Sequence, residues 1–438
     1  MGREIERLIQ RLLAEGEKSG FDLGAMEGFV RERMHHCGAI VLSRVLAAET
    51  RAAAASRCPC GGTWRSLKRR GKTVLTVLGE VRLERIIQRC DHCGATRAAE
   101  DEVLDVVRTG FSPGVRRMMA RTGEEVPFDK ARDLMWELAG VRVTDKDVER
   151  KAEEIGAQVH ELAEKRRREV FSEAGTEGSE APPTLYIAVD GTGVPVLKKE
   201  TEGRKGKGVD QVARSREAKL GALFTQTGVN KAGEPVRDPG STTYVGRIES
   251  AETFGPRLYA EAVRRGHDRA KRTVLLGDGA PWIWNLADWH FPGACQIVDY
   301  YHAKEHLGTL AGLLFPQDEK AKKVWRETLT GILWAGEIER LVSRLRAMKL
   351  RGPKKEARDR EADYFEHNKK RMRYAIFRAQ NLFIGSGVVE AGCKTLIGRR
   401  LKQSGMHWTV QGANDILALR CSIASGRFED YWVSRRAA

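Results

Sequence analysis

The stretch 185–193 reads LYIAVDGTG, and it decides how the second half of the chain folds. The five apolar or β-prone residues before Asp190 indicate a buried strand, and the aspartate follows directly at the strand's carboxyl end. Two later apolar runs end in the same way, one at Asp278 and one at Asp299. The sequence therefore predicts three strands that each deliver a carboxylate to one edge of a sheet.

The segments between these acids supply the rest of the domain. Residues 218–225 and 242–246 are further β-prone runs that form a meander with the first strand, and the pattern turns helical at about Glu252. Another helix opens at Pro281, because proline is favoured in the first turn of a helix. A sheet with helices between its later strands is the fold that we expect here.

Carboxylates gathered at one edge suit metal-assisted phosphoryl transfer. Mg²⁺ and Mn²⁺ are hard cations that prefer oxygen ligands, and they keep positions open for phosphate and water. Two such ions can activate the attacking oxygen and neutralise the leaving one. A third carboxylate normally completes the site, and Glu390 offers one in the first turn of a helix introduced by Gly385-Ser-Gly387. The alternative for each acid is a structural role, because strand-end aspartates often cap turns or helices.

Two tight cysteine pairs flank a predicted hairpin in the first quarter of the chain. Residues 73–78 and 81–87 are β-prone runs joined at Gly79-Glu80. The hairpin brings the two pairs together, as one structural, tetrahedral Zn²⁺ ion requires. The first pair has the tight C-x-C spacing, which leaves His92 open as a substitute ligand. The sequence predicts a zinc ribbon, with four unliganded thiols as the alternative. The cysteines concerned are Cys58, Cys60, Cys90 and Cys93.

The other segments of the amino-terminal half are predicted to be helical. Residues 3–55 contain two amphipathic helices whose apolar stripes indicate packing or dimerisation. Residues 127–138 are a predicted helix, 139–143 a tight turn with a glycine, and Thr144 the cap of a second helix. This pattern is a helix-turn-helix candidate, with a plain helical hairpin as the alternative. Residues 172–183, rich in Gly, Ser, Glu and Pro, indicate a linker.

Composition narrows the class of partner. The 438 residues include 76 Lys and Arg against 60 Asp and Glu, and the net charge of +16 favours a polyanion, with double-stranded DNA as the leading candidate. No stretch approaches the ~18 uninterrupted apolar residues of a membrane span, and nothing near the first residue marks export. We therefore expect a cytoplasmic, nucleoid-associated protein with no membrane partner.

Four motifs follow one another in the second half of the chain. They are Asp190-Gly-Thr-Gly, Leu275-Leu-Gly-Asp278-Gly-Ala-Pro-Trp-Ile-Trp284, Asp299-Tyr-Tyr-His302-Ala-Lys-Glu-His306-Leu and Gly385-Ser-Gly-Val-Val-Glu390-Ala-Gly-Cys-Lys394, followed by Arg400-Leu-Lys-Gln-Ser-Gly-Met-His-Trp408. In this order they resemble prokaryotic insertion-sequence transposases of the ISKra type. The resemblance implies a ribonuclease-H-like catalytic domain of the DDE superfamily. It implies that Asp190, Asp278 and Glu390 are the catalytic triad and hold the Mg²⁺ or Mn²⁺ ions, two per active site.

The same resemblance implies roles for residues between the second and third acids. This interval is mostly helical, which indicates an all-helical insertion at about 303–380 within the catalytic domain. Asp299 and His302 are similar to an Asp-x-x-His signature of related Mutator-like transposases, which helps to handle the flanking or flipped DNA strand. The helices expected in the insertion cover 303–314, 321–334, 338–348 and 356–378.

Several cations and one aromatic residue are expected to contact DNA. Trp408 lies close to Arg399, Arg400 and Lys402 in the sequence, which suits stacking on an unpaired base, with core packing as the alternative. Phosphate contacts are expected from the predicted ribbon and from the second helix of the helix-turn-helix. The cations concerned are Arg69, Arg70, Lys146 and Arg150.

Together these features predict a multidomain α+β protein. Its expected parts are amino-terminal helices (1–55), a zinc ribbon (56–100), a helical DNA-binding region with the helix-turn-helix (101–171), the linker (172–183) and the catalytic domain with its helical insertion (184–438). The expected function is a DNA transposase that binds terminal inverted repeats, cleaves DNA and transfers the freed strand to target DNA, as a homodimer or larger synaptic assembly. The alternatives are a zinc-containing DNA-binding regulator derived from a transposase and a structure-specific nuclease without strand transfer.

Overall fold

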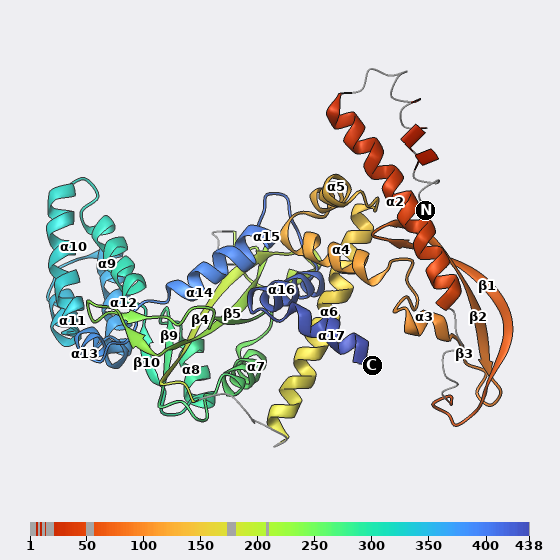
Figure 1. The fold of residues 1–438 in the computed structure, drawn as a ribbon. Helices are drawn as coiled ribbons and strands as arrows, with labels where there is room; N and C mark the ends of the chain where they lie inside the picture. The colour runs from red at the N-terminus through yellow and green to blue at the C-terminus, as the bar shows by residue number, and fades with distance from the viewer. Residues whose placement is uncertain are drawn as a thin grey trace. The chain divides into compact units, whose positions relative to one another are not determined.

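The structure is a computed structural model in which two units are distinguished, residues 1–154 with 437–438, and residues 155–436 (Figure 1). It describes residues 22–49, 57–172, 181–206 and 210–437, together with five positions between residues 6 and 14. Most of the first predicted helix and of the predicted linker lie outside these ranges. None of the described helices has both the length and the apolar character that a membrane crossing needs.

The first unit combines a three-stranded antiparallel sheet with helices. Its strands β1 (Trp64–Thr76), β2 (Gly79–Cys90) and β3 (Thr96–Ala98) pair in that order, and the long helix α2 (Leu23–Glu49) contacts β2. The short helix α3 (Ala99–Val103) follows β3 directly. The second predicted amino-terminal helix is therefore confirmed as α2, whereas the sequence had not indicated β3.

The hairpin turn lies earlier than predicted. Thr76 pairs with Gly79, so the turn consists of Val77 and Leu78, and Gly79-Glu80 already belongs to β2. The Thr76 hydroxyl closes this turn: it donates to the Gly79 carbonyl (2.8 Å) and accepts from the Leu78 amide (3.2 Å). Gly79 has a φ of +110°, a conformation that favours glycine. Strand β1 also starts nine residues earlier than predicted, because its polar first half carries no apolar alternation.

Three helices complete the first unit. They are α4 (Pro113–Glu125), α5 (Phe128–Ala139) and the first part of α6 (Asp145–Phe171), which continues into the second unit. Met119, Met135 and Val148, one from each helix, are buried together. Gly140 ends α5 in the left-handed region (φ +63°), and Thr144 caps α6 by accepting from the Asp147 amide at 3.0 Å. The predicted helix, turn and capped helix are all present.

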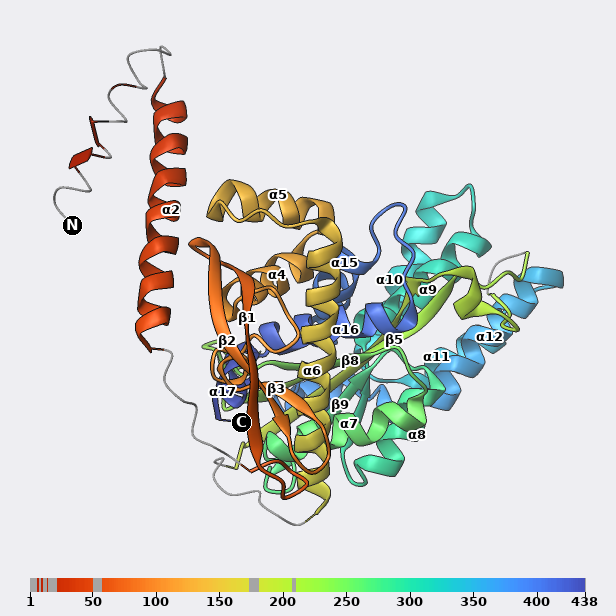
Figure 2. The ribbon, with the colours of Figure 1, turned by 90° about the vertical axis from the view of Figure 1, so that its right-hand side faces the viewer.

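The second unit is built on a mixed five-stranded sheet in the order β10-β9-β4-β5-β8 (Figures 1 and 2). Strand β4 runs parallel to β9 and β9 parallel to β10, whereas β4 and β5, and β5 and β8, are antiparallel. A separate two-stranded ribbon, β6 (Gly228–Val229) with β7 (Pro235–Val236), follows β5. The strands are β4 (Thr184–Pro195), β5 (Ser215–Gln226), β8 (Thr243–Arg247), β9 (Arg272–Gly277) and β10 (Cys295–Val298). The predicted strands are confirmed, and so is the mixed α+β class.

Helices cover both faces of this sheet. A Cβ on Gly221 of β5 would lie 2.4 Å from Leu258 of α7 (Ala251–Arg264), which packs against α8 (Pro281–His290). On the opposite face, a Cβ on Gly246 of β8 would lie 3.2 Å from Leu417 of α16 (Val410–Ala424). Helix α14 (Gly387–Gly392), the π-helical turn 393–398 and α15 (Arg399–Leu401) precede α16, and α17 (Phe428–Ala437) follows it.

The region between β10 and α14 contains only helices among its described elements. They are α9 (Tyr300–Leu314), α10 (Glu319–Trp334), α11 (Ile338–Arg346), α12 (Gly352–Asn368) and α13 (Tyr374–Ala379), with a short 3₁₀ turn at 369–371. The prediction of a single helix over 356–378 is therefore wrong. The Asn368 side chain donates to the Tyr364 carbonyl (3.0 Å) at the end of α12, and a 3₁₀ turn separates this helix from α13.

Candidate functional site

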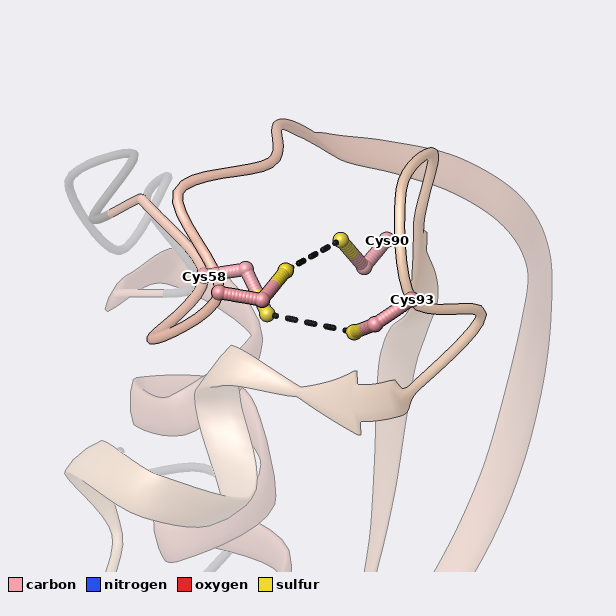
Figure 3. A group of neighbouring side chains, drawn as sticks. Cys58, Cys90 and Cys93 are labelled. Carbon is pink, nitrogen blue, oxygen red and sulfur yellow. Dashed lines mark hydrogen bonds between the residues drawn. The ribbon is translucent and has the colours of Figure 1, made fainter.

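The four cysteines of the hairpin base form one cluster (Figure 3). Their sulfur atoms all lie within 4.8 Å of one another, with 3.6 Å between Cys58 and Cys93 and 3.5 Å between Cys60 and Cys90. A tetrahedral Zn²⁺ with Zn–S bonds of about 2.3 Å places its sulfurs at about this spacing. These thiols could therefore hold one metal ion, as predicted.

The loops around the cluster are shaped to bring the sulfurs together. A Cβ on Gly62 would lie 2.6 Å from the Cys90 sulfur, so only glycine lets the first knuckle approach this closely. The backbone N–H of His92 donates to the Cys90 sulfur at 3.4 Å. The cluster of ligand atoms consists of the four thiols, and the His92 ring does not belong to it.

Asp190 lies inside β4 and not at its end, because the ladder with β5 continues to Pro195. The parallel ladder with β9 ends earlier, at Ala188, so the Asp190 carboxylate still stands at the carboxyl end of the parallel strands. It accepts from the Gly191 amide at 2.7 Å. Burial raises the pKa of Asp190, and the negative charge of Asp278 contributes to the rise. Two of the predicted acids therefore lie within electrostatic reach of each other.

Asp278 follows β9 in a tight turn that opens α8. Its carboxylate accepts from the Ala280 amide (2.8 Å), and its carbonyl accepts from the Tyr364 hydroxyl (2.9 Å). Gly279 has a φ of +101°, and a Cβ there would lie 2.7 Å from the Tyr364 ring. Tyr364 of α12 thus packs on the turn that carries Asp278, so the helical insertion supports the acidic edge.

Glu390 reaches the same edge from α14, but its carboxylate is not gathered with the aspartates. Its side chain is 45% exposed and lies 3.8 Å from the Lys394 ammonium. One turn later, the Cys393 thiol contacts the Asp190 carboxylate; burial and this charge raise the pKa of the thiol. Residues three apart lie near one helix face, so α14 carries Glu390 on the side of the helix that also carries Cys393. In the described part of the chain, the cysteines alone form a set of three or more ligand atoms within 4.8 Å.

Asp299 is buried and serves as a structural anchor in this structure. It is only 1% exposed, caps α9 by accepting from the His302 amide (2.8 Å), and accepts from both the amide and the hydroxyl of Ser386. The Tyr300 amide donates to the Ile384 carbonyl (2.8 Å) beside it. These bonds fasten the loop before α14 to the end of β10.

His302 belongs to a network that the sequence analysis did not single out. Its Nε2 lies 3.2 Å from Nε2 of His306, whose Nδ1 lies 2.7 Å from the Glu361 carboxylate. The His306 ring stacks on Tyr364 with 4.0 Å between centroids. The positive field of His302 lowers the pKa of Asp190, against the larger effect of burial, so the network faces the acids. The four-residue spacing of His302 and His306 could have indicated that these two side chains meet on one helix face. Nothing in the sequence indicated their contact with α12.

The predicted DNA-binding cations differ in their exposure. Most are exposed, and Lys146 and Arg150 pair with acids on their own helix at 2.5 and 2.8 Å. Lys402 donates to Thr192 of β4 at 2.5 Å, close to Asp190. Arg400 is the exception: it is fully buried, with its guanidinium 4.9 Å from the Trp408 ring centroid, so the surface role predicted for it is not supported. The exposed members are Arg69, Arg70, Lys146, Arg150, Arg399 and Lys402.

Trp408 is buried, with 8% of its surface exposed. Its indole N–H donates to the Leu401 carbonyl (3.1 Å), and its backbone bridges to Val196 at the end of β4. Its backbone N–H and carbonyl bond to Pro195 and Leu197 at 3.2 and 2.9 Å. This geometry matches the packing alternative, because a base has no access to the ring face without rearrangement.

No family model matches this chain, and no curated protein matches it. Among solved structures, the chain is similar to the Drosophila P element transposase strand transfer complex, at 8% identity and a TM-score of 0.26, over 73% of this chain and 79% of that one. A TM-score this low does not establish a shared fold. We therefore base the function on the residues of the site.

Proposed function

We propose that the chain is a DNA transposase that binds the terminal inverted repeats of its insertion sequence and catalyses metal-dependent strand cleavage and strand transfer. The observation that supports this proposal is that Asp190 and Asp278 interact electrostatically where the parallel strands end, and we assign Glu390 of α14 as the third acid. These three acids lie in the first, second and fourth of the ordered motifs that resemble insertion-sequence transposases.

The finer fold assignment is part of this proposal. We assign the second unit as a ribonuclease-H-like catalytic domain, supported by a meander of β4, β5 and β8 followed by the parallel strands β9 and β10. The all-helical region between β10 and α14 then interrupts the domain before its last acid. Its Tyr364 hydrogen-bonds the Asp278 carbonyl and its Glu361 pairs with His306, so the insertion would help to position the site.

The donor set fits Mg²⁺ or Mn²⁺, because carboxylate oxygens are the ligands that these hard cations prefer. Asp190, Asp278 and Glu390 would hold two such ions, which would supply Lewis-acid activation and charge neutralisation. Two aspartates already share the edge, and the exposed Glu390 side chain must turn away from Lys394 to join them.

The chain's own groups position DNA and manage the proton. In cleavage, a water oxygen bonds to phosphorus and the bond to the 3′-oxygen breaks; in transfer, the freed 3′-hydroxyl bonds to a target phosphorus and displaces another 3′-oxygen. Each attacking water or hydroxyl oxygen loses a proton, which His302, hydrogen-bonded to His306 beside Glu361, would accept, and each displaced 3′-oxygen takes up a proton. Lys402, beside Asp190 through Thr192, is placed to contact a phosphate oxygen.

The first unit would recognise the transposon ends. One structural Zn²⁺ on the four cysteines would hold the hairpin base, and exposed cations of β1 and of the first turns of α6 would contact phosphates. Assembly as a homodimer or larger complex would bring two ends together. The cations proposed for this are Arg69, Arg70, Lys146 and Arg150.

The decisive experiment is a joining assay. A labelled duplex that carries the DNA flanking the chain's coding sequence is incubated with the full chain, Mg²⁺ and a supercoiled plasmid. We expect covalent transfer of label to the plasmid, and no transfer with Asp278→Asn. Cutting of the duplex without joining would point to a nuclease instead.

A second candidate function is a DNA-binding regulator without chemistry. The observation that favours it is the separation of Glu390 from the two aspartates. Specific binding of the duplex, with neither cutting nor joining in Mg²⁺ or Mn²⁺, would select this candidate over the transposase.

A further inference from the structure

A cavity lies beside β8, the edge strand opposite β10, and β5 separates this strand from β4 and its Asp190. Its volume is about 140 Å³, room for several waters or one phosphate group. Helices α6, α7 and α16 surround β8 here (Figure 2), and every lining residue belongs to the second unit. Its lining contains six arginines: Arg166, Arg167, Arg247, Arg257, Arg264 and Arg427.

Some of these arginines are fully engaged with carboxylates. Arg427 donates to both oxygens of Glu261, at 2.7 Å each, and Arg257 donates to Glu249 at 2.8 Å and also to Glu164. Arg167 donates to Glu164 at 2.8 Å. These ion pairs form part of the cavity wall.

Two others are not satisfied by the protein. Arg247 and Arg264 make no side-chain hydrogen bond to any residue that the structure describes, and their nearest carboxylate oxygens lie 3.7 Å (Glu249) and 3.6 Å (Glu261) away. The Arg247 side chain is only 15% exposed. A guanidinium has five donors, and neither of these two groups is sealed from solvent in the described structure. Both groups are therefore available to an acceptor that enters the cavity.

Two further donors face the same space. His160 of α6 has no hydrogen-bond partner among the described residues; burial, with the fields of Arg247 and Arg257, lowers its pKa to about 4, so it is neutral. The amides of Tyr244 and Ile248 point outward from β8 and are bound by Ser425 and Asn414. By the alternation of the ladder, the Gly246 amide between them also points outward, into the cavity lining.

The charge balance of the cavity is positive. Six arginines and two glutamates line it, while Glu249, Asp415 and Asp430 approach the arginines from outside the lining. We propose that this cavity binds a small phosphate-type oxyanion, orthophosphate or pyrophosphate, through Arg247, Arg264 and His160. Oxyanions of this class present several acceptor oxygens around one centre, which matches donors converging from three sides.

The geometry favours a small anion over the backbone of duplex DNA. The side chains of Arg247, Arg257 and Arg264 are only 15% to 33% exposed. Their guanidinium groups can therefore contact only a group that enters the cavity. Duplex phosphates track along a surface and need exposed cations. The lining of this cavity contains none of the three proposed catalytic acids, so the test does not depend on the proposed function.

The test is calorimetric titration of the full chain with inorganic pyrophosphate at constant ionic strength, with sodium chloride as the reference. We expect saturable binding with one site per chain in the wild type. Arg247→Gln and, separately, Arg264→Gln should weaken it at least tenfold. Arg340→Gln, which changes an exposed arginine of α11 that pairs with Glu337, is the matched control and should bind as the wild type does.

The outcomes are distinct. Absence of saturable binding by the wild type, or equal weakening by Arg340→Gln, overturns the proposal. If Arg247→Gln has an altered circular dichroism spectrum, the more exposed Arg264→Gln decides. If the Arg247 and Arg264 variants lose affinity for a 20-base-pair duplex and the wild type ignores pyrophosphate, the ligand is a DNA phosphate and the small-anion assignment is wrong.

Discussion

The thiols at the base of the hairpin and the acids at the edge of the five-stranded sheet are both candidate metal sites, but they are assembled differently. The thiols come from residues 58–93, on two knuckles joined by one hairpin, and their sulfurs already stand at ligand spacing. The acids come from positions 190, 278 and 390, and two share the edge while the third points elsewhere. The cysteine site is formed by residues that are close in the sequence, so one hairpin is enough to assemble it. The acidic site is formed by distant segments, so it depends on the tertiary contacts that position each of them.

The largest expected effect concerns the local site. Cys90→Ser should remove the metal and unfold the hairpin base, because so short a ribbon has little core of its own. Metal analysis of protein purified without chelator should find about one Zn²⁺ per chain in the wild type and less than half that in the variant. Cys295→Ser, at a half-buried cysteine outside the cluster, is the control and should keep its zinc. Retention of zinc by Cys90→Ser would require another ligand set.

The next effect concerns the long-range site. Asp190→Asn and Asp278→Asn should each slow strand cleavage on the order of 10³-fold with end binding largely intact, because they act on transition-state charge while affinity comes mainly from cations. Cleavage rates and duplex affinities of both variants are measured in Mg²⁺. The exposed Asp288→Asn of α8 is the matched control. Normal cleavage by either variant would remove that aspartate from the site.

The sequence was sufficient where local pattern determines structure. The apolar runs located β9 and β10, and the cysteine spacing located the thiol cluster. Prediction from the sequence failed where residues from distant parts of the chain determine the local structure. Strand β4 continues past Asp190 because β5 pairs with it, and Arg400 is buried because the chain folds Trp408 over it. The pattern of charges in the sequence carried no sign of either contact.

The contacts of Tyr364 and of Asp299 could not be predicted from the sequence either. Tyr364 lies more than eighty positions after Asp278, and its bond to the Asp278 carbonyl depends on how α12 packs. Asp299 was expected to handle DNA, whereas the structure buries it as an acceptor for Ser386. Such roles follow from tertiary packing, which residue spacing alone does not encode.

A moderate effect should follow from loosening one tether of the long-range site. Ser386→Ala removes a 2.6 Å hydrogen bond to the buried Asp299 carboxylate, and losing a bond to a charged group costs about 1.5–3 kcal/mol. We expect a lower urea midpoint together with slower cleavage, since the loop before α14 leads into the helix that carries Glu390. Ser343→Ala, at an exposed serine of α11, should change neither. A destabilised variant with unaltered cleavage would show that this tether does not place Glu390.

The smallest expected effect concerns the burial of His160, a residue outside both the cysteine site and the acidic site. Segments that are distant in the sequence bury its side chain. His160 lies on α6, and Arg247 of β8, Arg257 of α7 and Arg167 surround it. Burial comes first and these charges second in lowering its pKa from 6.5 to about 4. Above pH 6.5 the imidazole is neutral in both folded and unfolded chains, so it contributes no pH dependence. As the pH falls from 6.5 towards 4, the unfolded chain takes up a proton that the folded chain refuses, so stability is lost over that window.

His160→Gln cannot take up that proton, so the variant should lose less stability on acidification than the wild type. We expect the difference between wild type and variant to shift by roughly 1–2 kcal/mol between pH 7.5 and pH 5, measured by urea unfolding at both values. Titration of the His160 ring by NMR, assigned by its absence in the variant, measures the pKa directly. A midpoint near 6.5 would mean that distant segments do not bury this ring. The second unit would then be packed more loosely around β8 than in the structure. The difference between a region assembled from distant segments and the locally assembled cysteine site would be larger than we describe.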